Sequence, residues 1–167
     1  MKTLTIRHLT LGSGQPKIAV PLVARDEAAL SAALKNLEHA CFDIIEFRAD
    51  YFAQAGNSEY LLTQAAAVRS AFPETPLLFT FRRAEEGGEY PCSKAYYFEL
   101  LDKAAASGII DIIDIELSTG ESEVRQAVAA AKAHNTAVLM SNHDFHQTPA
   151  KSDITGRLKK MEEAGAD

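Results

Sequence analysis

Several features that would point to a secreted or membrane protein are missing from this sequence. It has only two cysteines, Cys41 and Cys92, which form neither a CxxC pair nor a disulfide framework. Reduced thiols in the cytoplasm are therefore the expectation. No apolar run approaches the roughly 18 residues of a membrane span, and the first residues lack the apolar core of a signal peptide. We expect a cytoplasmic protein without a membrane partner.

An excess of basic residues is also absent. The 17 lysines and arginines are outnumbered by 23 aspartates and glutamates, which gives a formal net charge of −6. This charge disfavours nucleic acid or an anionic membrane as a partner, because either would need a basic face. A small anionic substrate remains compatible with it if arginines gather locally. The hydrophobic share of 47% over 167 residues is typical of a single globular domain, residues 1–167, with its own core.

Strand-like and helix-like segments alternate from residue 17 onward. Before it, apolar and polar residues alternate up to a glycine pair, which predicts an N-terminal hairpin in residues 1–16. Strictly alternating elements predict parallel strands joined by right-handed crossovers. The predicted strands are 17–22, 43–47, 77–81, 109–115 and 136–141, with helices capped by Asp26 and Ser58, a helix from Ser93 to Ser107, a helix from Glu121 to His134, and a fifth that carries Ile154, Leu158 and Met161.

A glycine-rich phosphate loop is missing as well. The first turn after a strand, residues 22–26, has no glycine, which disfavours a doubly wound dinucleotide-binding fold. Two features favour a (β/α)8 TIM barrel: charged residues follow several strands, and the apolar residues of each helix lie along one face only. A complete barrel has about 250 residues. We therefore predict an α/β protein with an incomplete barrel, about the first five βα units after the hairpin.

Polar side chains follow the strands at their carboxyl ends, where α/β proteins place their chemistry. Because strand side chains alternate between faces, residues two apart point the same way and should converge at the mouth of a barrel. Arginines and carboxylates around one imidazole would suit a small polyhydroxylated acid. The pairs that share a face are Glu46 with Arg48, Thr80 with Arg82, Asp114 with Glu116, and Ser141 with His143.

Structural roles compete with functional ones at these positions. Arg48 with Glu46, or Arg82 with Glu116, could form ion pairs that seal the barrel end. A lone histidine such as His143 most often bonds a loop carbonyl. The loop 84–90 is an acidic turn, in which Glu86 either faces solvent or reaches back to orient an imidazole.

Five motifs occur in order along the whole chain, and together they resemble the type I 3-dehydroquinate dehydratase family. The most distinctive is the Ser-Asn-His-Asp-Phe segment. The motifs are Glu46-Phe47-Arg48-Ala49-Asp50, Leu78 to Arg82, Glu86-Gly87-Gly88-Glu89, Asp114-Ile115-Glu116 and Ser141-Asn142-His143-Asp144-Phe145.

The resemblance implies a (β/α)8 barrel lyase of the shikimate pathway. Such an enzyme converts 3-dehydroquinate to 3-dehydroshikimate and water through a lysine imine, without a metal or an organic cofactor, usually as a homodimer. His143 would be the general acid/base and Glu86 would orient it. The resemblance further assigns Glu46, Phe47, Arg48 and Arg82 to substrate binding, and Asp50, Asp114 and Glu116 to the supporting shell.

The sequence departs from the family pattern in two ways. Pro21 occupies a strand end where several relatives carry serine, so a substrate contact by this side chain is not expected. The family's imine-forming lysine lies on the next strand, beyond Asp167, while Lys151, Lys159 and Lys160 belong to the fifth helix. We therefore expect this chain to represent the N-terminal two-thirds of the enzyme, with residues 1–167 alone inactive.

Two other functions remain open. In a metal-dependent barrel isomerase or epimerase, Glu46, His143 and either Asp114 or Glu116 would ligate a divalent ion, although nearby arginines would repel it. A non-catalytic fragment that binds small acids is the alternative outside the enzymes. Metal analysis and borohydride trapping of a substrate adduct would distinguish these readings.

Overall fold

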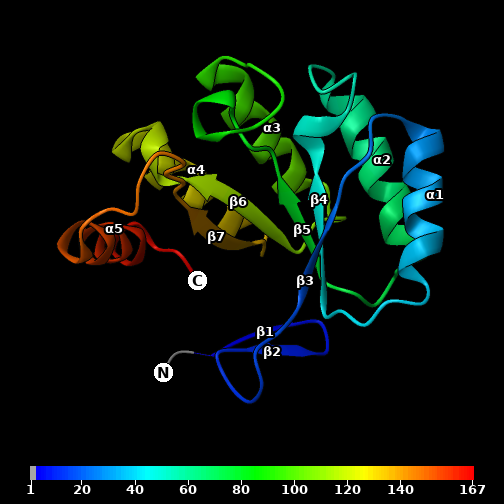
Figure 1. The fold of residues 1–167 in the computed structure, drawn as a ribbon, viewed down its shortest axis with the longest axis horizontal. Helices are drawn as coiled ribbons and strands as arrows, with labels where there is room; N and C mark the ends of the chain where they lie inside the picture. The colour runs from blue at the N-terminus through cyan, green and yellow to red at the C-terminus, as the bar shows by residue number, and fades with distance from the viewer. Residues whose placement is uncertain (1–2) are drawn as a thin grey trace.

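The structure, a computed structural model, describes residues 3–167, and Met1 and Lys2 of the predicted hairpin segment lie outside the described residues. A curved sheet of five strands forms the centre, and helices line its outside (Figure 1). The strands are β3 (Ala19–Leu22), β4 (Ile44–Arg48), β5 (Leu77–Thr80), β6 (Ile112–Glu116) and β7 (Ala137–Ser141). The helices are α1 (Glu27–Leu37), α2 (Ser58–Ala71), α3 (Lys94–Ala106), α4 (Glu121–Ala133) and α5 (Lys151–Ala164).

The sheet order confirms the α/β prediction. The strands lie in chain order, β3-β4-β5-β6-β7, and every neighbouring pair is parallel. Within the described chain, β3 and β7 each pair on one side only, so the barrel is not closed. The hairpin of β1 (Leu4–Ile6) and β2 (Leu9–Leu11) forms as expected, below the sheet in Figure 1.

Side-chain caps fix where three of the helices begin. Asp26, the predicted cap of α1, and Ser93, at which the third helix was predicted to begin, accept the backbone N–H three residues ahead at 2.8 and 3.2 Å. The predicted cap of α2 is wrong by one residue, because Asn57 accepts from Tyr60 at 3.1 Å and Ser58 is already helical. Asparagine and serine are about equally good caps, so composition alone does not separate adjacent candidates.

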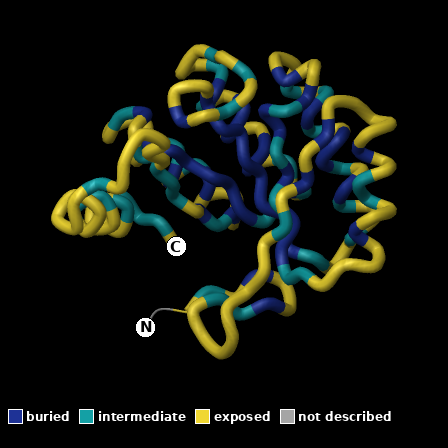
Figure 2. The backbone as a smooth tube through the Cα atoms, viewed as in Figure 1, coloured by how far each residue is buried: buried dark blue, intermediate teal, exposed yellow. Residues whose placement is uncertain are grey.

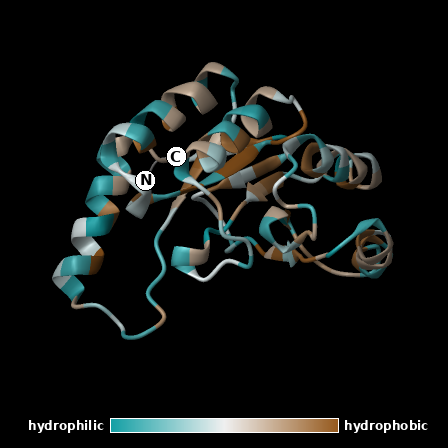
Figure 3. Cartoon of the chain, turned by 90° about the horizontal axis from the view of Figure 1, so that it is seen from above, coloured by the Kyte–Doolittle hydropathy of each residue, from teal (hydrophilic) through white to brown (hydrophobic). Residues whose placement is uncertain are grey.

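Apolar side chains form two packed layers, and strands β5 and β6 are buried along their whole length (Figure 2). The larger layer lies between the outer face of the sheet and the helices, and the strands appear as the brown centre of Figure 3. The smaller layer lies on the inner face, where Ile6 and Leu9 of the hairpin pack on Ile44, Leu78 and Ile112. The hairpin thus closes the amino ends of the strands and leaves their carboxyl ends for polar groups.

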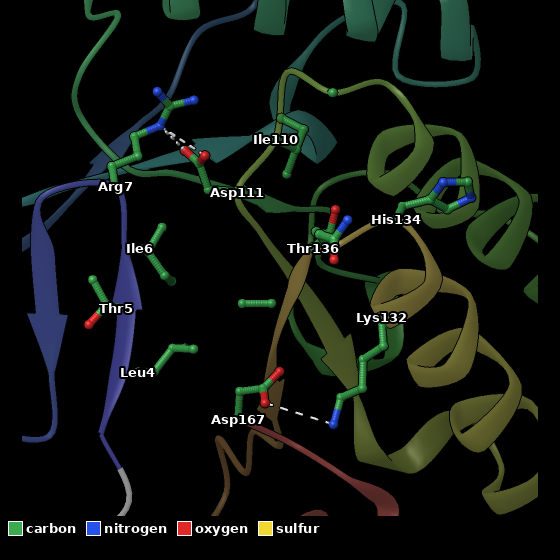
Figure 4. Close-up of a pocket in the computed structure, with 13 residues that line it drawn as sticks. Leu4, Thr5, Ile6, Arg7, Ile110, Asp111, Lys132, His134, Thr136 and Asp167 are labelled. Atoms are coloured by element: carbon green, nitrogen blue, oxygen red, sulfur yellow. Dashed lines mark hydrogen bonds and ion pairs between the residues drawn. The ribbon is translucent and has the colours of Figure 1, made fainter.

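An ion cluster fastens the hairpin to the amino ends of the strands. Asp111 lies just before β6 and accepts from Arg7 Nε at 2.9 Å, from Arg69 Nη2, and from the backbone N–H of Leu77 at 2.8 Å. Beside it, a pocket of about 540 Å³ separates the hairpin from the start of β7, and Figure 4 shows Arg7 and Asp111 at its rim. In barrels this end serves stability rather than chemistry.

Replacing Asp111 with alanine is expected to lower the free energy of unfolding by about 2 to 4 kcal/mol, because three donors lose their acceptor. Lys103→Ala, which removes one member of an exposed pair with Glu99, is the control and should cost under about 0.5 kcal/mol. Urea unfolding of the variants measures both. Equal costs would show that the cluster around Asp111 does not hold the hairpin.

No helix in residues 3–167 combines the length and the apolar character that a membrane crossing requires.

Candidate active site

A buried carboxylate holds the histidine that follows β7. Glu86 ends the short 3-10 helix η2 (Ala84–Glu86) after β5, and its Oε2 lies 2.9 Å from His143 Nδ1. The same oxygen accepts the backbone N–H of His143 at 3.0 Å. The Glu86 side chain is 5% exposed, while that of His143 is 34% exposed. Because a carboxylate accepts, Nδ1 is the protonated nitrogen of the neutral ring, and Nε2 keeps its lone pair for a ligand.

An aromatic ring stacks against one face of the imidazole. Phe145 stacks on His143 with 6.1 Å between ring centroids and 12° between planes. Gly87 makes room for this ring, since a Cβ at that position would lie 2.5 Å from it. Gly87 also has φ +82°, a left-handed conformation that glycine adopts without strain. The Gly87 turn therefore serves both the return of Glu86 and the placement of Phe145.

Arg82 joins three strands through a buried network. Its guanidinium pairs with Asp114 through Nη2, and its Nη1 donates to Glu116 at 3.1 Å and to Ser141 Oγ at 2.8 Å. Ser141 Oγ in turn donates to Asp114 at 2.6 Å. Burial raises the pKa of both carboxyl groups, and the charge of Arg82 acts against this rise. Burial alone would lower the pKa of Arg82, but the two carboxylates raise it overall.

Arg48 binds a different carboxylate from the one that strand alternation suggested. Its Nε and Nη2 donate to the two oxygens of Asp50, both at 2.9 Å, rather than to Glu46. The chain turns directly after β4 into the 3-10 helix η1 (Ala49–Tyr51), which returns Asp50 toward Arg48. Burial lowers the pKa of the Arg48 guanidinium, yet Asp50 raises it overall. Asp50, 1% exposed, therefore supports Arg48, and Glu46 is left free of that pairing.

Phe47 does not lie in the site, and the structure corrects this assignment. Its side chain is fully buried on the outer face of the sheet, where its ring lies 5.3 Å from that of Phe52 and 5.8 Å from that of Phe79. Alternation along β4 is the reason, since Phe47 lies between Glu46 and Arg48 and points the opposite way. Only the backbone of Phe47 is near the other polar groups.

The remaining predicted residues share one end of the sheet. The charge of Glu86 contributes to the raised pKa of Glu116, and the charge of Glu46 contributes to that of Asp114. These interactions link the His143–Glu86 pair, the Arg82 network and Glu46 at the carboxyl ends of β4 to β7. An arginine, several carboxylates and a histidine therefore lie in one region.

The ligand set that a metal-dependent isomerase would need is not formed. Among residues 3–167, no three histidine, cysteine, aspartate or glutamate side chains come together in a way that could hold a metal ion. Asp114 and Glu116 are instead ion-paired with Arg82.

Two polar residues next to the histidine were missed by sequence reasoning. Asn142 Nδ2 donates to Glu86 Oε1 at 3.3 Å, and Arg157 of α5 donates to Asn142 Oδ1 at 2.5 Å. The position of Asn142 inside the histidine motif was an available signal. For Arg157, 15 residues further on, the sequence offers none.

Parallel strands in barrel order, with a histidine, arginines and carboxylates at their carboxyl ends, define part of an α/β-barrel protein with a candidate active site. The profile of the family described as type I 3-dehydroquinase matches residues 18–167. The chain belongs to this family.

Named relatives agree with this assignment. The chain is 54% identical over 165 residues to 3-dehydroquinate dehydratase of Neisseria gonorrhoeae, and 47% identical over 167 residues to that of Escherichia coli O7:K1. It covers 99% and 100% of its own length in these matches, but only 65% and 66% of theirs. The crystal structure of type I 3-dehydroquinate dehydratase from Clostridium difficile, with covalently modified comenic acid, matches with a TM-score of 0.96 at 38% identity and covers 99% of this chain and 65% of that one. The chain therefore spans slightly less than two-thirds of the length of these proteins.

Proposed function

We propose that this chain supplies the acid/base and hydroxyl-binding groups of a 3-dehydroquinate dehydratase. The reaction is the elimination of water from 3-dehydroquinate to give 3-dehydroshikimate through a lysine imine. The contact between Glu86 and His143 beside Arg82, in a chain of this family, is the observation that supports this most strongly. The Clostridium difficile relative, with its covalently modified ligand, is consistent with covalent chemistry in this family.

His143 would move the protons. A carbon-bound proton beside a ketone is too weakly acidic for a neutral imidazole, but a protonated imine accepts the resulting electron pair and removes this obstacle. With Nδ1 held by Glu86, Nε2 is the nitrogen that takes the proton. The resulting imidazolium can return a proton to the departing hydroxyl, which leaves as water, and the same group serves imine formation and hydrolysis.

Glu46, Arg48 and Arg82 would hold the ring hydroxyls of the substrate. Each guanidinium is fixed by buried carboxylates, Arg48 by Asp50 and Arg82 by Asp114 and Glu116. A fixed planar donor loses little freedom when a hydroxyl binds to its remaining N–H groups. Asp50, Asp114 and Glu116 therefore act through the arginines and need not touch the substrate.

The lysine that forms the imine would not belong to the strands described here or to the residues that directly follow them. Within residues 3–167, no lysine lies on a strand or directly after one, and Lys151, Lys159 and Lys160 are exposed on α5. Residues 1–167 alone should therefore not turn over 3-dehydroquinate. We use natural polypeptide for the chain as it is produced in the cell, in which we propose that the lysine is present. The alternative, a protein that binds small acids without chemistry, also predicts no turnover by residues 1–167, but it predicts no turnover by the natural polypeptide either.

Borohydride trapping distinguishes a dehydratase from a protein that only binds small acids. The natural polypeptide should convert 3-dehydroquinate and, when reduced with borohydride in its presence, gain one substrate adduct on a lysine that peptide mass spectrometry locates. The same treatment of residues 1–167 should give neither product nor adduct. Turnover by residues 1–167 would overturn the lysine assignment, and a natural polypeptide that binds the substrate without turnover or adduct would favour the binding module.

A cytoplasmic location and a homodimer complete the proposal, both by analogy with the family. Light scattering of the natural polypeptide at two concentrations would test the second.

A further inference from the structure

We propose that Arg157 is a positioning residue for His143, acting from helix α5 through Asn142 and Glu86. This inference rests on the proposed function, because it gives Arg157 a role in the same proton transfer. Four side chains form an unbroken sequence of contacts. Arg157 Nη1 donates to Asn142 Oδ1 at 2.5 Å, Asn142 Nδ2 donates to Glu86 Oε1 at 3.3 Å, and Glu86 Oε2 lies 2.9 Å from His143 Nδ1.

The donors and acceptors of the neighbouring groups allow only one orientation of the Asn142 amide. A guanidinium has donors and no acceptor, so the Asn142 atom that faces Arg157 must be the oxygen. The NH₂ group of the same amide then faces Glu86, where an ionised carboxylate can only accept. A rotated amide would place its oxygen against the Glu86 oxygen and its NH₂ against an Arg157 donor. Arg157 therefore removes the ambiguity between the two nearly isosteric orientations of the Asn142 amide.

The orientation of Asn142 matters because it anchors the oxygen of Glu86 that the histidine does not use. Glu86 is 4% exposed, so water does not satisfy its oxygens. Oε2 accepts both the backbone N–H and the ring of His143, while Oε1 accepts from Asn142. With both oxygens bound, the carboxylate plane cannot turn, and the imidazole is held with Nε2 outward. Without Asn142 in this orientation, Glu86 would keep its histidine contacts but lose the bond that fixes its plane.

Within residues 3–167, the contact between Arg157 and Asn142 is a hydrogen bond outside the packed core. None of the residues of α5 is buried, and Asn142 and Arg157 together line two pockets of about 410 and 270 Å³. The helix is held to α4 elsewhere, where Arg125 Nη1 donates to the Glu163 carbonyl at 2.9 Å. Within residues 3–167, removal of the Arg157 side chain therefore breaks a hydrogen bond without opening a buried layer of α5.

A double-mutant cycle in the natural polypeptide tests the proposal. The variants are Asn142→Ala, Arg157→Ala and their combination, with Arg157→Lys as the conservative replacement. Lys160→Ala is the matched control, because Lys160 is an exposed cation on the same helix. Two readouts are measured: kcat and KM for 3-dehydroquinate, and the ¹⁵N spectrum of His143 without substrate, which reports which ring nitrogen carries the proton.

Arg157→Ala should lower kcat by about tenfold with KM changed less than about twofold, and should reduce the share of rings protonated at Nδ1. In the Asn142→Ala background the same substitution should have no further effect, since Arg157 acts only through that amide. Arg157→Lys should recover part of the loss, and Lys160→Ala should match the wild type.

Wild-type kcat and ¹⁵N spectrum in Arg157→Ala would overturn the proposal. So would effects of the two substitutions that add, because Arg157 would then act by another route, such as holding α5. If the wild-type polypeptide proved inactive, the proposed function would fall, but the ¹⁵N spectra would still decide whether Arg157 orients His143.

Discussion

Replacing His143 with alanine is expected to lower kcat for 3-dehydroquinate by roughly 10² to 10⁴-fold in the natural polypeptide, with little change in KM. The expectation follows from the geometry around the ring. Nδ1 is bound to a buried carboxylate, Phe145 covers one face, and Nε2 remains to exchange protons with a ligand. Such a group acts in the transition state rather than in substrate binding, so its loss appears in kcat.

The matched control is His146→Ala. His146 lies three residues further on, is exposed, and belongs to the same loop. Its removal should leave kcat within about twofold of the wild type. Steady-state assays of the two variants at one pH measure the difference. Equal losses in both variants would indicate that the loop, rather than the His143 imidazole, supports the activity.

Replacing Arg82 with methionine is expected to lower the free energy of unfolding by roughly 3 to 5 kcal/mol at neutral pH and to abolish substrate binding. Arg82 is 7% exposed and compensates the charges of Asp114 and Glu116, which are 3% and 0% exposed. Methionine fills most of the side-chain volume but leaves two buried carboxylates next to each other without a cation.

The difference in the free energy of unfolding between the wild type and the Arg82→Met variant should grow as the pH rises. Burial raises the pKa of Asp114 and Glu116 above their ordinary values of 3.8 and 4.5. A carboxyl group whose pKa is higher in the folded state binds more protons there, so the free energy of unfolding falls as the pH rises from the ordinary to the raised value. Arg82 holds both pKa values down, and its removal extends this window upward. Protonation at low pH should therefore restore part of the variant's stability.

Urea unfolding of the wild type and of Arg82→Met at pH 5 and pH 8 measures this effect. Lys103→Met is the control, because Lys103 forms an exposed pair with Glu99 on α3 and the loss of this pair should cost under about 0.5 kcal/mol. A loss of unfolding free energy that is small, or the same at both pH values, would show that Arg82 does not neutralise the two carboxylates.

Local patterns in the sequence predicted most of the fold. The alternation of strand and helix patterns predicted the parallel sheet, the alternation of apolar and polar residues predicted the hairpin, and Asp26 caps α1 as expected. These features depend on neighbours within a few residues, which the sequence displays directly. The ion pair between Arg82 and Glu116, which was the structural alternative for these residues, is present.

Features that depend on turns or distant contacts were not predicted. The partner of Arg48 is Asp50 because the chain turns into η1 directly after β4, which alternation cannot anticipate. Phe47 was assigned to substrate binding with its motif, although its own parity points it into the core. The Arg157–Asn142 contact and the Arg7–Asp111 contact, which spans 104 residues, follow from how the elements pack in three dimensions.

The most direct test of the account is a crystal structure of the natural polypeptide after borohydride reduction with 3-dehydroquinate. The reduced adduct should lie at the carboxyl ends of β4 to β7, with His143 Nε2 next to the carbon beside the former imine and Arg82 or Arg48 bound to a ring hydroxyl. An adduct located elsewhere, or a His143 ring turned away from it with Nδ1 released from Glu86, would contradict the account.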